Sequence, residues 1–176
     1  MSNKPKPYPL IIGLLVPGLM VVVIAVSVFV PRLFAPPPQY DFIYSLSDGY
    51  YPEVEYFVSN SRVQMRDHKN PYPLPQNTAP TPVRLYRHYV KENRSAGISF
   101  EEAQKLIVSD IAQSPDGFEV GPGMRGDSFF FFYSSYPDYG SMRLKGHGVA
   151  HKLNLAQGQG SYYGYQGFRF LTWVIK

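Results

Sequence analysis

Two histidines, His147 and His151, stand four positions apart in the stretch HGVAH. On a helix this spacing would place both imidazoles on one face, as in zinc peptidases, but those enzymes need a glutamate where this chain has Gly148. Glycines on both sides of His147 disfavour a helix, whereas on a strand the two rings would still share a face. The remaining histidines, His68 and His88, are far away in the chain, so the sequence signals no third ligand and predicts no metal site.

Other catalytic residue types occur without the pattern that their chemistry needs. The triplet at 126–128, Gly-Asp-Ser, resembles the nucleophile block of GDS-type esterases, but it precedes a predicted strand and the chain has no Asp-x-x-His pair. Glu53 and Glu55 would share one face of a strand, which keeps an acid–base carboxylate pair as an alternative. The absence of cysteine excludes disulfides and thiolate chemistry. We therefore predict no catalytic residue and no cofactor.

Tyrosine is the strongest remaining signal, with 15 residues, many of them in segments rich in Gly, Ser and Pro. Exposed tyrosines in such loops provide contact area at low entropic cost. The candidate recognition surface comprises Tyr136, Tyr139, Tyr162, Tyr163 and Tyr165. The alternative is that these tyrosines occupy half-buried positions of a β-sheet, where the residue is common.

An uncharged segment at 7–31, with its apolar core at 10–30, precedes these residues. A helix over that core is about 30 Å long, which matches the hydrocarbon thickness of a bilayer. Signal peptides have a shorter apolar region and a small-residue cleavage site. Cleavage after Ser27 or Ala35 is the alternative, but the first position lies inside the apolar run and three prolines follow the second. The pattern predicts an uncleaved transmembrane helix.

The charges that flank this segment predict its orientation. Lys4 and Lys6 precede it and only Arg32 follows it before Asp41, so the N-terminus is expected in the cytoplasm. The expected layout is a cytoplasmic N-terminus at 1–8, a transmembrane helix at 9–31, a Pro-rich spacer at 32–39 and an extracytoplasmic β-rich domain at 40–176. The predicted location is the inner (plasma) membrane, with a periplasmic domain.

Hydrophobic alternation and turn residues predict the strands of that domain. Residues 40–47, 53–58 and 62–66 should form a three-stranded meander, with a tight turn at 59–61. Further strands are expected at 83–90, 128–133, 141–145, 149–155 and 168–175. The run of four phenylalanines at 129–132 is apolar on both faces and is expected in a central strand.

One soluble helix is predicted in SFEEAQKLIVSDIAQ, where Ser99 and Glu102 match a capping box. Its apolar stripe should face the core and consists of Phe100, Ala103, Ile107 and Ile111. The expected fold class is therefore α+β, with an N-terminal transmembrane helix followed by a mainly antiparallel β-sheet domain with one amphipathic helix.

Composition limits the partners of this domain. After position 39 the chain has 14 basic and 13 acidic residues, which gives no electrostatic footprint for nucleic acid. The expected function is that of a membrane-anchored interaction or accessory module, with other membrane or cell-envelope proteins as partners. The alternative is a binder of glycan or another cell-wall ligand, or a hydrolase with a weak sequence signal.

Overall fold

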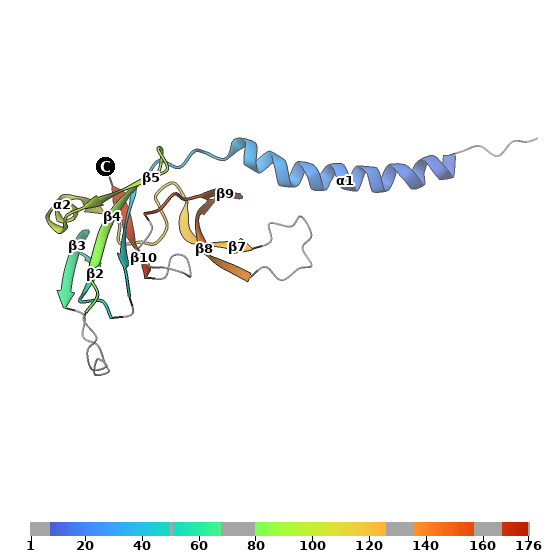
Figure 1. Ribbon diagram of the computed structural model, residues 1–176. Helices are drawn as coiled ribbons and strands as arrows, with labels where there is room; N and C mark the ends of the chain where they lie inside the picture. The colour runs from blue at the N-terminus through green and yellow to red at the C-terminus, as the bar shows by residue number, and fades with distance from the viewer. Residues whose placement is uncertain (1–7, 50, 68–79, 126–135, 157–166, 176) are drawn as a thin grey trace, which may run out of the picture. The chain divides into compact units, whose positions relative to one another are not determined.

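The computed structural model describes residues 8–49, 51–67, 80–125, 136–156 and 167–175. The chain divides into two compact units, residues 1–36 with 147–149 and residues 37–146 with 150–176. The principal element of the first is a helix, and the second is built on strands (Figure 1).

Helix α1 (Tyr8–Phe34) confirms that the apolar N-terminal segment is helical. Ser27 inside it is satisfied locally, because its hydroxyl donates to the carbonyl of Val23 at 2.8 Å. Within the described parts of the chain, no helix is long and apolar enough to cross a membrane. The structure therefore does not support the transmembrane assignment expected at 9–31.

The other elements follow in chain order. They are β1 (Phe42–Ser47), β2 (Val54–Ser59), β3 (Arg62–Asp67), β4 (Val83–Tyr89), β5 (Arg94–Ile98), α2 (Phe100–Lys105), β6 (Ile107–Val108), β7 (Glu119–Arg125), β8 (Tyr136–Gly146), β9 (Val149–Lys152) and β10 (Phe168–Ile175). Three sheets form, in the strand orders β5-β4-β1-β10-β6, β2-β3 and β7-β8-β9. The mainly antiparallel α+β class is confirmed.

Strand β1 lies at the centre of the largest sheet, and its first five residues are buried. Phe42 is opposite Trp173 of β10 on one side and His88 of β4 on the other, both in antiparallel register. The predicted meander is therefore wrong in its pairing, because β1 binds distant strands rather than β2. The segment at 129–132, which was expected to be central, lies outside the described residues.

The β2–β3 hairpin is confirmed at the predicted turn. Asn60 and Ser61 have φ values of 53° and 54°, which are those of the two central residues of a type I′ turn. The backbone twist of a type I′ turn matches the right-handed twist of the two strands that it connects. The register is uninterrupted from the pair Val54–Asp67 to the pair Ser59–Arg62.

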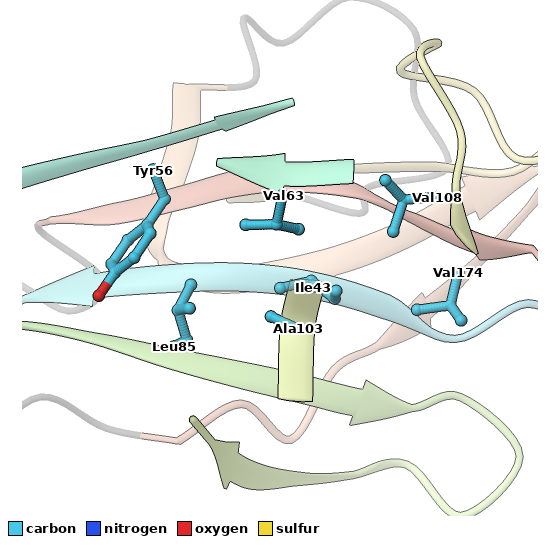
Figure 2. Close-up of a cluster of buried hydrophobic side chains, with 7 residues drawn as sticks. All are labelled: Ile43, Tyr56, Val63, Leu85, Ala103, Val108 and Val174. Atoms are coloured by element: carbon cyan, nitrogen blue, oxygen red, sulfur yellow. The ribbon is translucent and has the colours of Figure 1, made fainter. Parts of the chain in front are cut away.

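One face of the central sheet contributes to a cluster of buried side chains, which are aliphatic except for Tyr56 (Figure 2). Its buried members are Ile43, Tyr56, Val63, Leu85, Ala103, Val108 and Val174. They come from β1, β4, β6 and β10 of the sheet, from the β2–β3 hairpin and from α2. The hairpin and the helix together therefore cover this face.

Helix α2 begins as predicted and ends much earlier. The Ser99 hydroxyl accepts from the Glu102 backbone N–H at 3.1 Å, and the Glu102 carboxylate accepts from the Ser99 N–H at 2.8 Å. The guanidinium of Arg62 donates to three carbonyls at the C-terminus of the helix, those of residues 104–106.

Beyond Lys105 the chain pairs with the central sheet instead of continuing as a helix. Ile107 lies opposite Ile175 of β10, and the Ser109 N–H donates to the Trp173 carbonyl at 2.9 Å. Ile107 and Ile111 are exposed, so the predicted four-residue core stripe is wrong beyond Ala103.

The opposite face of the central sheet is aromatic. Phe42 lies 4.8 Å from the His88 ring and 5.5 Å from the Trp173 ring between centroids. Tyr44 stacks on Tyr86 at 5.4 Å. Edge and offset ring contacts of this kind are favourable beyond the area that they bury. The two faces of β1 therefore belong to two different cores.

The later strands agree in part with the sequence. Strand β10 has its predicted bounds, and the segment predicted at 141–145 is part of the longer β8. The strand predicted at 149–155 ends at Lys152 in β9. Strand β7 was not predicted, because its Gly-Pro-Gly sequence at 121–123 is untypical of a strand; its register with β8 is irregular between Pro122 and Gly123.

Candidate functional site: a basic groove

The predicted tyrosine surface lies largely outside the described residues. Tyr162, Tyr163 and Tyr165 fall in the undescribed segment 157–166. Tyr136 and Tyr139 belong to β8, where the structure describes the backbone but not these side chains. The tyrosine surface therefore stays a prediction.

The histidine pair HGVAH forms a hairpin rather than a helix. His147 has φ 49° in the turn between β8 and β9, and His151 is an exposed residue of β9. Among the described residues, no three side chains of the usual metal-ligand types gather closely enough to hold a metal ion.

The glutamates considered as an acid–base pair have different surroundings. Glu55 in β2 forms ion pairs with Arg66, at 2.7 Å, and with Arg169. The hydrogen bond from Arg169, followed by that from Arg66, lowers the pKa of Glu55 below its ordinary value. Glu53 lies outside β2, so the two do not share a strand. Glu55 is held as a carboxylate, which is unsuited to donate a proton at neutral pH.

A groove of about 640 Å³ lies in the second unit. Three buried apolar side chains form its floor: Val90, Leu144 and Leu153. Three basic or imidazole side chains also line it: Lys91, His151 and Lys152. Asn93 and the segment 37–39 complete the lining. We call this site the basic groove.

Hydrogen bonds fix the walls of the basic groove relative to each other. Asn93 has φ 47°, a conformation that asparagine tolerates better than most residues. Its amide Nδ2 donates to the Lys152 carbonyl at 3.0 Å, and its Oδ1 accepts from the Asn154 N–H at 3.0 Å. One asparagine therefore joins the β4–β5 turn to the segment that follows β9.

The base of the same turn is held by Asp41. Its carboxylate accepts from the Val90 N–H at 3.2 Å and from the Arg87 guanidinium at 2.6 Å. Because Asp41 directly precedes β1, the turn that carries Lys91 is fixed to the central sheet.

Among the described residues that line the basic groove, none is acidic. Within the described part of the chain, Lys91 and Lys152 form no ion pair. The adjacent Glu92 is paired with Arg94. Asp116 accepts from the Gln39 N–H at 2.8 Å and from the Ser114 hydroxyl, and it is not part of the lining. The described lining therefore contains two lysines and no carboxylate, in a domain whose overall charge is close to zero.

Buried His88 lies outside the lining of the basic groove. Its Nδ1 lies 3.0 Å from the Ser95 hydroxyl, and its Nε2 has no partner among the described residues. Burial lowers the pKa of His88 to about 4, against the smaller opposing effects of the Asp41 charge and of Asn93. The imidazole is neutral at pH 7 and packs on Phe42, so we assign it a structural role.

Sequence reasoning missed the basic groove, because its residues are separated along the chain. Lys91 and Lys152 carry no local motif, and their segments belong to different sheets. Side-chain hydrogen bonds from Asn93 and Ser95 to the chain at 152–154 join the two segments. Comparison of the chain with protein-family models, with curated proteins and with solved structures finds no match.

Proposed function

We propose that this chain is a single-pass membrane-anchored accessory module, in which α1 is the anchor and the β-rich unit acts on the extracytoplasmic side of the plasma membrane. The observation that carries the proposal is the apolar composition of α1 on every side. Residues 19–24 are all large and apolar. Six consecutive positions surround the helix completely, because one turn takes about 3.6 residues.

A helix that is apolar on every side needs an apolar environment around it. The described residues contain no helix that is long and apolar enough to span a membrane. The proposal therefore rests on the complete sequence, in which no residue from 7 to 31 is charged. The 27 residues of α1 would extend about 40 Å, longer than the hydrocarbon core of a bilayer.

Exposed isoleucines support the accessory role. Ile107 is 54% exposed, Ile111 61% and Ile175 37%, and Ile107 is paired with Ile175 in the β6–β10 register. Exposed apolar groups at a sheet edge are typical of contact with another protein. A glycan-binding role depends on the tyrosines outside the described residues, since none of the described residues that line the basic groove is Tyr, Phe or Trp.

Cysteine accessibility tests the anchor, because the natural chain contains no cysteine. We would compare Ser2→Cys with Gln113→Cys, which replaces an exposed residue of the β-rich unit. In spheroplasts a membrane-impermeant maleimide should label the Gln113→Cys variant, and it should reach the Ser2→Cys variant only after lysis. Extraction of the chain by alkaline carbonate, or the reverse labelling pattern, would contradict the proposal.

A mild detergent extract tests the accessory role separately. The wild-type chain should migrate in a complex larger than the monomer, and Ile107→Asp should reduce that complex. Gln113→Asp is the control, because it adds the same charge at an exposed polar position. A wild-type chain that is monomeric in extracts of its native membrane would overturn the accessory role.

A further inference from the structure

We propose that the basic groove binds the phosphate of an anionic membrane phospholipid, with the ammonium groups of Lys91 and Lys152 as its charged partners. The inference extends the proposed function, because it takes the ligand from the membrane in which α1 is anchored. It commits to a lipid, and free phosphate is treated as a competing outcome.

Charge complementarity is the first argument. Lys91 and Lys152 both line the groove, with no acidic side chain in the lining and no ion pair to either lysine among the described residues. Their segments are joined at the groove, because Asn93, two positions after Lys91, donates to the Lys152 carbonyl. Two lysines that line one groove attract a phosphate by their positive charge.

The apolar part of the lining is the second argument. Pro37 is exposed and Pro38 is half-buried, so both prolines offer apolar surface to a ligand in the groove. Leu144 and Leu153 also line the groove and are buried. Inorganic phosphate is solvated on every side and gains nothing from such a surface, whereas a phospholipid carries glycerol and acyl carbons next to its phosphate. The combination of charge and apolar surface therefore favours an amphipathic anion.

The position of the groove along the chain is the third argument. Its lining begins at Pro37, three residues after Phe34, the last residue of α1. Three residues span at most about 11 Å, whichever way the two units are oriented. If α1 spans the bilayer, this part of the lining is therefore held within reach of the headgroups at the end of the anchor.

Hydrogen bonds also fix the groove before a ligand arrives. The Gln39 N–H donates to Asp116 at 2.8 Å, and the Asn93 amide connects the β4–β5 turn to the segment after β9. A preformed site avoids the entropic cost of ordering its walls on binding.

Native mass spectrometry of the full-length chain in neutral detergent provides the test. The chain would be titrated with a short-chain phosphatidylglycerol and, separately, with the matching phosphatidylcholine. We would compare the wild type with the double variant Lys91→Gln/Lys152→Gln. The control double variant is Lys105→Gln/Lys145→Gln, which removes the same charge outside the groove. Fluorescence of Trp173, the single tryptophan, would show that each variant is folded.

We expect one phosphatidylglycerol to bind in preference to phosphatidylcholine. The groove variant should bind it roughly 30-fold more weakly, which corresponds to about 2 kcal/mol for two lysines, and the control variant should bind as the wild type does. Equal affinity for the two lipids, or equal losses in the two double variants, would overturn the proposal. Full displacement of the lipid by millimolar inorganic phosphate would show a small-anion site instead of a lipid site.

This measurement and the labelling test can fail independently. If carbonate extracts the chain but the chain still prefers phosphatidylglycerol, the lipid-site proposal is supported and the anchor proposal is rejected. If the chain is integral and correctly oriented but shows no lipid preference, the anchor proposal is supported and the lipid-site proposal is rejected.

Discussion

On one face of β1, Ile43 joins a cluster whose other buried members are aliphatic apart from Tyr56. On the opposite face, Phe42 and Tyr44 contact aromatic rings of β4 and β10. Both faces exclude water, but they differ in the polar atoms that their side chains carry. The aliphatic residues have no side-chain donor or acceptor.

The aromatic side chains have polar atoms that hold distant segments of the chain. The Tyr44 hydroxyl accepts from the Ala156 N–H at 2.8 Å, and Trp173 Nε1 donates to the Ala112 carbonyl at 2.7 Å. These bonds secure the segment after β9, which helps to line the basic groove, and the segment before β7. The aliphatic side chains thus stabilise the sheet by packing, whereas the aromatic side chains also hold the segments around the candidate site.

The largest effect is expected for Phe42→Ala, which removes the ring in contact with His88, Phe170 and Trp173. Loss of this fully buried ring should lower the free energy of unfolding by about 3–5 kcal/mol. Urea unfolding of the full-length chain in neutral detergent, followed by Trp173 fluorescence, measures it. A loss below about 1 kcal/mol would show that the aromatic face is not a tightly packed core.

The aromatic face should also make stability depend on pH through His88. Its pKa is about 4 in the folded protein and 6.5 ordinarily, so between these values the unfolded chain binds the proton more readily. His88 therefore lowers stability as the pH falls from 6.5 towards 4, by about 2 kcal/mol between pH 7 and pH 5. Urea unfolding at the two pH values measures this change.

His88→Phe is the matched variant for the pH experiment. Phenylalanine can keep the stack on Phe42, has no titrating group and removes the unpartnered Nε2. The variant should lose most of the pH dependence between pH 7 and pH 5. An unchanged dependence would assign the effect to other groups and would contradict the buried neutral imidazole.

The aliphatic face is tested by Ile43→Val, a change at the residue adjacent to Phe42. One buried methylene is lost, and the free energy of unfolding should fall by about 1 kcal/mol. The same urea experiment applies, and the loss should be equal at pH 7 and pH 5. A pH-dependent loss would indicate that the two faces are energetically coupled rather than separate.

The smallest global effect is expected for Tyr44→Phe, which removes only the hydroxyl that accepts from the Ala156 N–H. Stability should fall by about 1 kcal/mol or less, while amide hydrogen exchange should accelerate at Ala156. Exchange at Val63, in the aliphatic core, is the internal control. Equal acceleration at both amides would show that the hydroxyl supports the whole domain and not one segment.

The sequence predicted the elements whose determinants are local. The turn residues at 59–61 specify the β2–β3 hairpin, and Ser99 with Glu102 specifies the start of α2. It failed where distant pairing decides the structure. Ile107 and Ile111 continue a helical pattern, but hydrogen bonds to β10 are available there and the chain adopts β6 and an irregular segment instead.

The candidate site was less predictable than the fold. The basic groove needs the β4–β5 turn beside β9. The side chains of Asn93 and Ser95 make that contact by hydrogen bonds to a segment about 60 residues away. No periodic pattern of hydrophobic residues in the sequence indicates such a contact. The tyrosine surface had the stronger sequence signal, and the structure leaves it untested because those side chains lie outside the described residues.

The pairing of β1 with β10 also sets a condition on biosynthesis. The first strand of the β-rich unit is bonded along its length to a strand that begins at Phe168. The ribosome must therefore make almost the entire unit before the central sheet can close. Contacts this far apart in sequence are slow to form. A nascent chain interrupted before β10 leaves an open edge on β1, and such an edge favours aggregation.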